Sequence, residues 1–236
     1  MPVRKKEYIW ISINLESLDY KQVNTLFYKK TISNKMTILE KSNRRKTGLI
    51  ILSMSLFMFS PILMHFLGYK IPMFKNLGLS IETLAPVTAW IMAFILTILY
   101  VTYTFKVIPF VQKMQREISL FKIVGLMTIA GGILEEVVFR RWLMDLLMKL
   151  GYGDIIQIIV SGLAFGLIHI TWGLFGKEKQ FLKGAFIATT FLGFGLAIVY
   201  LIGNRNVGPC IISHSIINMI IEPWLVLAAI SKTRKL

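Results

Sequence analysis

Runs of about 20 apolar residues alternate with short polar stretches along most of this chain. A helix of that length matches the roughly 30 Å hydrocarbon core of a bilayer. Six segments are predicted to be membrane-crossing helices, at about 47–68, 84–105, 119–150, 154–175, 181–202 and 207–230. The pattern therefore predicts an all-α fold, a polytopic transmembrane helix bundle.

Residues that end or bend helices punctuate these segments. Gly151-Tyr152-Gly153 is a strong signal for the end of the third helix. Pro223 is expected to kink or interrupt the sixth helix near Ile221. Because most gaps between segments are short, neighbouring helices should pack antiparallel.

The first 46 residues are polar and basic, unlike the rest of the chain. They contain no early apolar stretch of the kind that a cleavable signal peptide has. We expect residues 1–46 to be a basic cytoplasmic segment that is either bound to an anionic membrane surface or weakly ordered. Residues 47–236 then form the transmembrane bundle, and residues at about 119–230 hold its chemically informative motifs.

Composition agrees with a membrane protein. Hydrophobic residues make up 55% of the 236 residues and charged residues 17%, less than the quarter or so of soluble domains. The net charge of +15 arises before residue 47 and in the gaps between segments, so nucleic-acid binding is not expected. Positive residues gather on cytoplasmic faces, which predicts that both termini are cytoplasmic. Frequent Lys and Ile suit a bacterium of low genomic GC content, so we expect the bacterial plasma membrane as the location.

Polar side chains inside three apolar segments are the main functional signal. An unpaired charge near the middle of a bilayer is costly, so such residues usually face the bundle interior and have a function. Six of them stand out: Glu135, Glu136 and Arg140 in the third segment, His169 in the fourth, and His214 and Asn218 in the sixth.

Their spacing indicates how these side chains are arranged. Glu136 and Arg140 lie four residues apart in the order that favours an ion pair, which leaves Glu135 free to act as a base. Glu135 and His169 are equally far along the chain from the turn that joins their helices. Antiparallel packing should therefore bring them level.

Glutamate and histidine together can activate water. A carboxylate in a low-dielectric pocket can take a proton from water, and His169 can hold that water. His214 and Asn218 share one helix face and can donate hydrogen bonds to the oxyanion of a tetrahedral intermediate. These residues predict hydrolysis of a peptide bond within the bilayer.

Other chemistries also fit these residues. Glu135, His169 and His214 can act as zinc ligands in a metal-assisted hydrolysis, although the HExxH motif is absent. A proton-coupled transporter would also bury Glu, His and Arg in a bundle. The single cysteine, Cys210, cannot build a thiolate site and is expected to be a small buried residue.

Three motifs resemble a known family. Glu135-Glu136-x-x-x-Arg140, Phe165-x-x-x-His169 and His214-x-x-x-Asn218 are similar, in order and on separate apolar helices, to the signature of the CPBP (CAAX protease and bacteriocin-processing, or Abi) intramembrane proteases. The resemblance covers about residues 131–221. It implies an all-helical membrane endopeptidase, often with more than six spans, so a bundle of about six to eight spans is expected.

The resemblance also implies a role for each motif residue. Glu135 and His169 would activate water, Glu136 and Arg140 would support the site, and the third-motif pair would form the oxyanion hole. Metal-dependent and metal-free mechanisms both fit the family, so zinc stays open as a cofactor. The expected substrate is a short membrane-associated peptide or a protein C-terminus. The alternative is a non-proteolytic bacteriocin-immunity or scaffold protein of the same fold.

Overall fold

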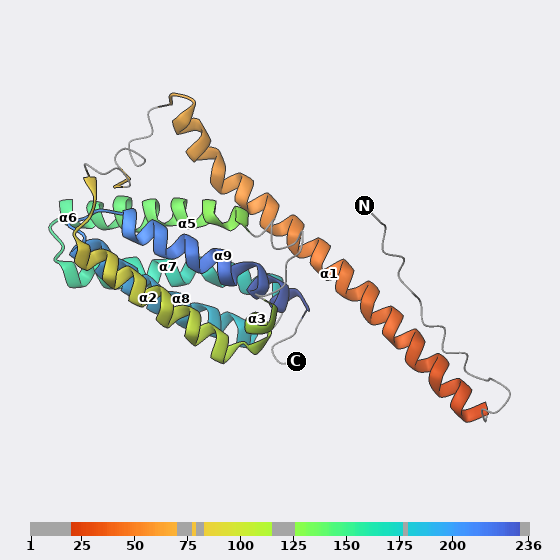
Figure 1. The fold of residues 1–236 in the computed structure, drawn as a ribbon. Coiled ribbons are helices and arrows are strands. Elements are labelled where there is room, and N and C mark those ends of the chain that lie inside the picture. Colours follow the sequence, from red (N-terminus) through yellow and green to blue (C-terminus); the bar gives the residue numbers. More distant parts are fainter. Residues whose placement is uncertain (1–19, 70–76, 79–82, 115–125, 177–178, 232–236) are drawn as a thin grey trace, which may run out of the picture. The chain divides into compact units, whose positions relative to one another are not determined.

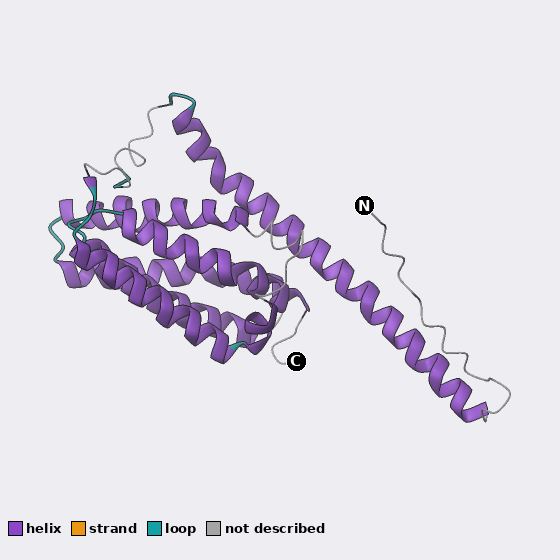
Figure 2. Cartoon of the chain, in the orientation of Figure 1, coloured by secondary structure: helices purple, strands orange, loops and turns teal. Residues whose placement is uncertain are grey.

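The computed structural model describes residues 20–69, 77–78, 83–114, 126–176 and 179–231 (Figure 1). Every regular element among these residues is a helix, as Figure 2 shows, so the predicted all-α class is confirmed. The chain divides into two compact units, residues 1–42 and 43–236. Residues 1–19 of the predicted basic segment lie outside the described residues.

The helices have the following bounds: α1 (Tyr20–Phe66), α2 (Val87–Val107), α3 (Pro109–Met114), the 3-10 turn η4 (Leu126–Thr128), α5 (Ile129–Glu136), the π-helix η5 (Val137–Met144), α6 (Asp145–Lys149), α7 (Asp154–Gly176), α8 (Lys179–Ile202) and α9 (Gly208–Ser231). From η4 to α6 the helical turns follow one another without a gap, so the third predicted helix changes type along its length. Residues 119–125 of that segment lie outside the described residues. π-helical turns are rare and often occur at functional sites.

Four helices of the described chain are long and apolar enough to cross a membrane: Glu40–Phe66, Val87–Val107, Lys183–Ile202 and Gly208–Ser231. They correspond to the first, second, fifth and sixth predicted segments. Asp154–Ile170, within the fourth, is a shorter apolar helix. These helices are those of an integral membrane protein, whereas the number of six to eight spans and the cytoplasmic position of the termini stay predictions.

Helix α9 is the central helix of the second unit. It contacts α2, α5, α7 and α8, and Figure 1 shows it running between α5 and α2. Most of its residues are buried, including Trp224 and Cys210, as expected for that cysteine. The helix continues through Pro223 to Ser231, so the predicted interruption near Ile221 does not occur.

Glycines let the backbones of neighbouring helices approach each other. A Cβ atom on Gly193 of α8 would lie 2.9 Å from the Cα atom of Gly162 of α7. A Cβ atom on Gly132 of α5 would lie 3.1 Å from the backbone nitrogen of Ser215 in α9. The second contact is important for function, because it brings the glutamates at the end of α5 next to α9.

Gly193→Ala should destabilise the protein. The added methyl group would meet the backbone of α7, which can move only if the two helices separate. Overpacking of this kind costs about 1–3 kcal/mol, so we expect a lower midpoint of thermal unfolding in detergent. Gly48→Ala is the matched control, since nothing lies within 4 Å of a Cβ atom at that position. An unchanged midpoint for Gly193→Ala would contradict the close approach of α7 and α8.

Candidate active site

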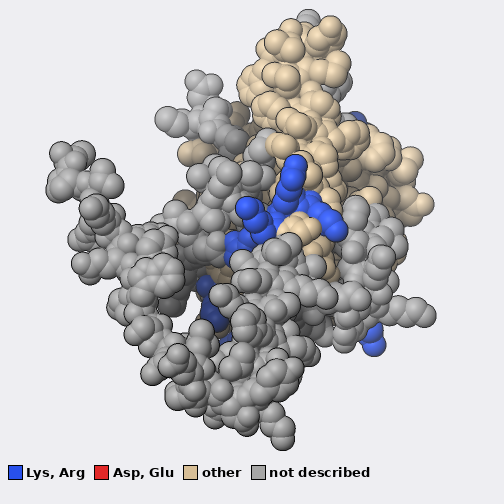
Figure 3. Space-filling model, turned by 90° about the vertical axis from the view of Figure 1, so that its right-hand side faces the viewer, with Lys and Arg blue, Asp and Glu red and all other residues tan. Residues whose placement is uncertain are grey.

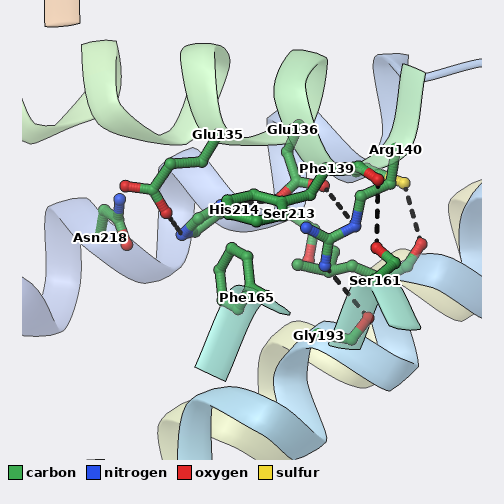
Figure 4. A network of polar contacts seen from close by, with 12 residues as sticks. Glu135, Glu136, Phe139, Arg140, Ser161, Phe165, Gly193, Ser213, His214 and Asn218 are labelled. Atoms are coloured by element: carbon green, nitrogen blue, oxygen red, sulfur yellow. Dashed lines mark hydrogen bonds and ion pairs between the residues drawn. The ribbon is translucent and has the colours of Figure 1, made fainter. Parts of the chain in front are cut away.

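The structure brings together the polar residues that the sequence singled out. Glu135 and Glu136 form the end of α5, and Arg140 follows in η5. In Figure 4 both glutamates point from their helix toward His214 of α9, and Asn218 lies one turn further along α9. His169 joins them from α7.

Glu135 faces two imidazole rings. Its Oε2 atom lies 3.5 Å from Nε2 of His169 and 3.8 Å from Nε2 of His214. Glu135 and His169 therefore lie side by side on neighbouring helices, as the sequence predicted. Both distances exceed those of a direct hydrogen bond, and Oε2 is buried without a hydrogen-bond partner among the described residues.

The other nitrogen of each ring fixes its orientation. Nδ1–H of His169 donates to the carbonyl oxygen of Phe165 at 2.7 Å. Nδ1 of His214 lies 2.8 Å from Oε1 of Glu136 and donates to this carboxylate. With hydrogen on Nδ1, a neutral imidazole presents a lone pair at Nε2. Nε2 of a neutral His169 and Oε2 of Glu135 therefore face each other as two acceptors, and a water molecule can donate to both.

Glu136 also forms the ion pair that the spacing predicted. Its Oε2 atom lies 3.1 Å from Nε of Arg140, and neither side chain is exposed. Arg140 also donates from Nη2 to the carbonyl oxygen of Gly193 in α8, at 3.1 Å. The bond between Glu136 and His214 could not be predicted from residue spacing, because it depends on which helices are neighbours.

Phe165, the aromatic residue of the second motif, packs against both histidines of the site and Arg140. Its ring centre lies 4.5 Å from that of His169 and 5.3 Å from that of His214. The guanidinium carbon of Arg140 lies 4.6 Å from the same ring centre, where the electron-rich face attracts a cation. The ring is completely buried, so it restricts both imidazoles and the arginine.

Asn218 has a weaker attachment. Its Nδ2 atom donates to the carbonyl oxygen of Thr128 at 3.4 Å, which is long for such a bond. A Cβ atom on Gly131 would lie 3.6 Å from Oε1 of Glu135 and 3.9 Å from Nδ2 of Asn218. The amide is therefore next to the carboxylate, and the loss of its long hydrogen bond costs little when it turns to another acceptor.

A cavity of about 170 Å³ begins at His169, His214 and Asn218 and extends between α2, α8 and α9. Its walls are mostly apolar. Glu222 of α9 is an acidic residue in this lining, and the sequence analysis did not single it out. The signal that identified the other glutamates, a carboxylate inside an apolar segment, would have found it.

The zinc alternative concerns the same three side chains. The metal-dependent alternative needs Glu135, His169 and His214 as ligands, each about 2 Å from one ion. Among the residues that the structure describes, no three His, Cys, Asp or Glu side chains are grouped so that they could hold a metal ion. No catalytic step is therefore assigned to a metal.

Residues 117–220 match a family model described as Type II CAAX prenyl endopeptidase Rce1-like, which belongs to the CPBP family. Over these residues the chain is a CPBP-family domain. No curated protein and no solved structure matches the chain. All six polar residues of the site lie within the CPBP match, and the family's endopeptidase activity agrees with a protease that acts in the membrane.

Arg140→Ala should be strongly destabilising, because it leaves the Glu136 carboxylate buried without its cation. The loss of one partner of a buried pair costs about 3–5 kcal/mol, which unfolding in detergent would measure. Replacement of the exposed Arg45 by alanine is the control and should change stability by about 0.5 kcal/mol or less. Equal effects of the two substitutions would show that the ion pair does not support the fold.

Proposed function

We propose that this protein is an intramembrane endopeptidase in which Glu135 and His169 activate a water molecule. The observation that carries the proposal is the distance of 3.5 Å between Oε2 of Glu135 and Nε2 of His169, with Nε2 of His214 at 3.8 Å from the same oxygen. A carboxylate oxygen and an imidazole nitrogen this close together can each accept one hydrogen of the same water. The match to the CPBP family, which contains CAAX endopeptidases, supports the same activity.

In the first step, Oε2 of Glu135 takes a proton from the water while the water oxygen attacks the carbonyl carbon of the peptide. His169 Nε2 accepts the second hydrogen of the water and so holds its oxygen toward the substrate. The imidazole keeps this orientation because Nδ1 is bonded to the carbonyl of Phe165. A positioned base of this kind contributes about 100- to 10 000-fold to a rate.

The tetrahedral intermediate carries its negative charge on the former carbonyl oxygen. Asn218 donates to this oxyanion from Nδ2. His214 takes part as the imidazolium: Nδ1–H donates to the carboxylate of Glu136 and Nε2–H donates to the oxyanion, and both hydrogens stay on the ring throughout. Donors held in place in a site without bulk water provide a large share of catalysis.

Collapse of the intermediate breaks the C–N bond. Glu135 returns its proton to the leaving nitrogen, so that the products are a carboxylic acid and an amine and the enzyme regains its starting charge. The apolar cavity beside the site has room for part of an apolar peptide. We therefore propose a short membrane-associated peptide or the C-terminus of a membrane-associated protein as substrate.

Glu135→Gln should abolish cleavage while the fold persists. The amide has nearly the same shape but cannot take a proton, so we expect cleavage of apolar peptides by purified protein to fall by about 100- to 10 000-fold. Asp154→Asn makes the same chemical change at an exposed residue and should leave the rate unchanged. Product masses would be measured by mass spectrometry.

The same assay distinguishes the alternatives. Because the proposed mechanism uses no metal, cleavage should persist with a chelator. Loss of activity with chelator and its return with zinc would contradict the metal-free mechanism. A protein that cleaves no peptide, and whose phenotype in cells survives Glu135→Gln, would be an immunity or scaffold protein instead.

Asn218→Ala should lower kcat by about 100- to 1000-fold with little change in KM, because its bond to the oxyanion exists only in the transition state. Ser53→Ala removes a polar group at an exposed residue of α1 and should leave both constants unchanged. Steady-state kinetics on one peptide would measure both. A rise in KM alone for Asn218→Ala would place this residue in substrate binding.

A further inference from the structure

Glu222 is a carboxylate in the active-site cavity that the proposed mechanism does not use. It lines the cavity together with His214 and Asn218, on the same face of α9. Its Oε2 atom is buried and has no hydrogen-bond partner among the described residues. A carboxylate removed from water is costly unless a partner compensates it. The cavity therefore offers an acceptor that a ligand can satisfy.

Helix geometry fixes how far this acceptor lies from the cleaved bond. Glu222 follows Asn218 by four residues and His214 by eight, which is about 6 Å and about 12 Å along the helix axis. An extended peptide advances about 3.3 Å per residue. When its scissile carbonyl faces His214 and Asn218, a side chain roughly two to four residues away reaches Glu222.

The neighbours of Glu222 indicate which side chain fits. Tyr100 and Tyr103 of α2 line the same cavity, and Tyr100 is within electrostatic reach of Glu222. Tyrosine rings attract cations through their faces. Gly184 and Ala188 of α8 also line the cavity, and these small residues leave room for a long side chain. A carboxylate and two phenol rings in an apolar cavity suit an ammonium or guanidinium group on a flexible stem.

A second, smaller cavity lies behind Glu222. It has a volume of about 10 Å³, and Ser55 of α1, Thr128 of η4 and Gly131 of α5 contribute to its lining. Such a volume is at about the minimum that holds one water molecule. Hydration of the carboxylate from this smaller cavity is thus limited to about one water.

We propose that Glu222 is a specificity-determining residue that selects peptides with a Lys or Arg side chain two to four residues from the cleaved bond. The inference rests on the proposed peptidase function. It adds a charge requirement to a substrate that is otherwise apolar.

Positive charge near the cavity mouth does not cancel this selection. Lys106 at the end of α2, Lys113 in α3 and Lys183 near the start of α8 are exposed at this end of the bundle. Figure 3 views that end and shows Lys and Arg side chains, with no Asp or Glu visible among the described residues. Exposed charges are screened by salt within about 8 Å, whereas Glu222 acts on a ligand inside the cavity.

The test compares peptides that differ only in one charge. A single Lys is moved along an apolar peptide on either side of the cleaved bond, and norleucine replaces it as the neutral analogue. Wild type, Glu222→Gln and the exposed control Asp154→Asn are assayed in the same detergent. Mass spectrometry maps the cleaved bond, and thermal unfolding verifies that each variant is folded.

We expect wild type to prefer Lys over norleucine by about tenfold or more in kcat/KM at a position two to four residues from the bond. Glu222→Gln should bring the two peptides to about the same kcat/KM, with cleavage of the norleucine peptide retained. Asp154→Asn should keep the preference.

The outcomes separate this inference from the function on which it rests. Equal cleavage of both peptides by wild type at every position would overturn the role of Glu222 alone, including the case in which the residue is held neutral by a proton. A preference for Lys that survives Glu222→Gln would overturn it as well. If wild type cleaves no peptide, the proposed function fails and the inference fails with it.

Discussion

The site depends on the contacts that the buried carboxylate of Glu136 makes with Arg140 and His214. This carboxylate pairs with Arg140 on its own helix and accepts from His214 on α9, while Arg140 reaches the backbone of α8 at Gly193. A buried charge is stable only when partners compensate it. Correct packing of three helices is therefore required to satisfy one side chain, and the same packing orients the imidazole that faces Glu135.

Two adjacent glutamates have different environments for this reason. The side chain of Glu136 is fully buried and held by a cation and an imidazole, whereas Glu135 is 14% exposed and its Oε2 atom lies 3.5 Å and 3.8 Å from the Nε2 atoms of His169 and His214. Successive residues of a helix point about 100° apart, so one can be fixed in the packed interior while its neighbour faces the two imidazole rings. In the proposed mechanism, Glu136 therefore orients His214, whereas Glu135 accepts the proton of the water.

Small residues decide how close these groups come. Gly132 lets α5 approach α9, and Gly162 with Gly193 lets α7 approach α8. In a bilayer, lipid is as apolar as the side chains, so helices associate through close packing and polar contacts more than through the hydrophobic effect. The close glycine contacts and the buried ion pair therefore act together to keep the helices that contain the site residues close to one another.

The sequence by itself determined the helical class, the positions of the apolar segments and the pair Glu136–Arg140, because these follow from local periodicity and from spacing along one helix. It also predicted that Glu135 and His169 lie level, from the short turn between their helices. Only the tertiary structure decided that His214 bonds to Glu136, that α9 runs unbroken through Pro223, and that Glu222 lines the cavity. Contacts between helices far apart in sequence depend on their packing, which periodicity along one chain does not encode.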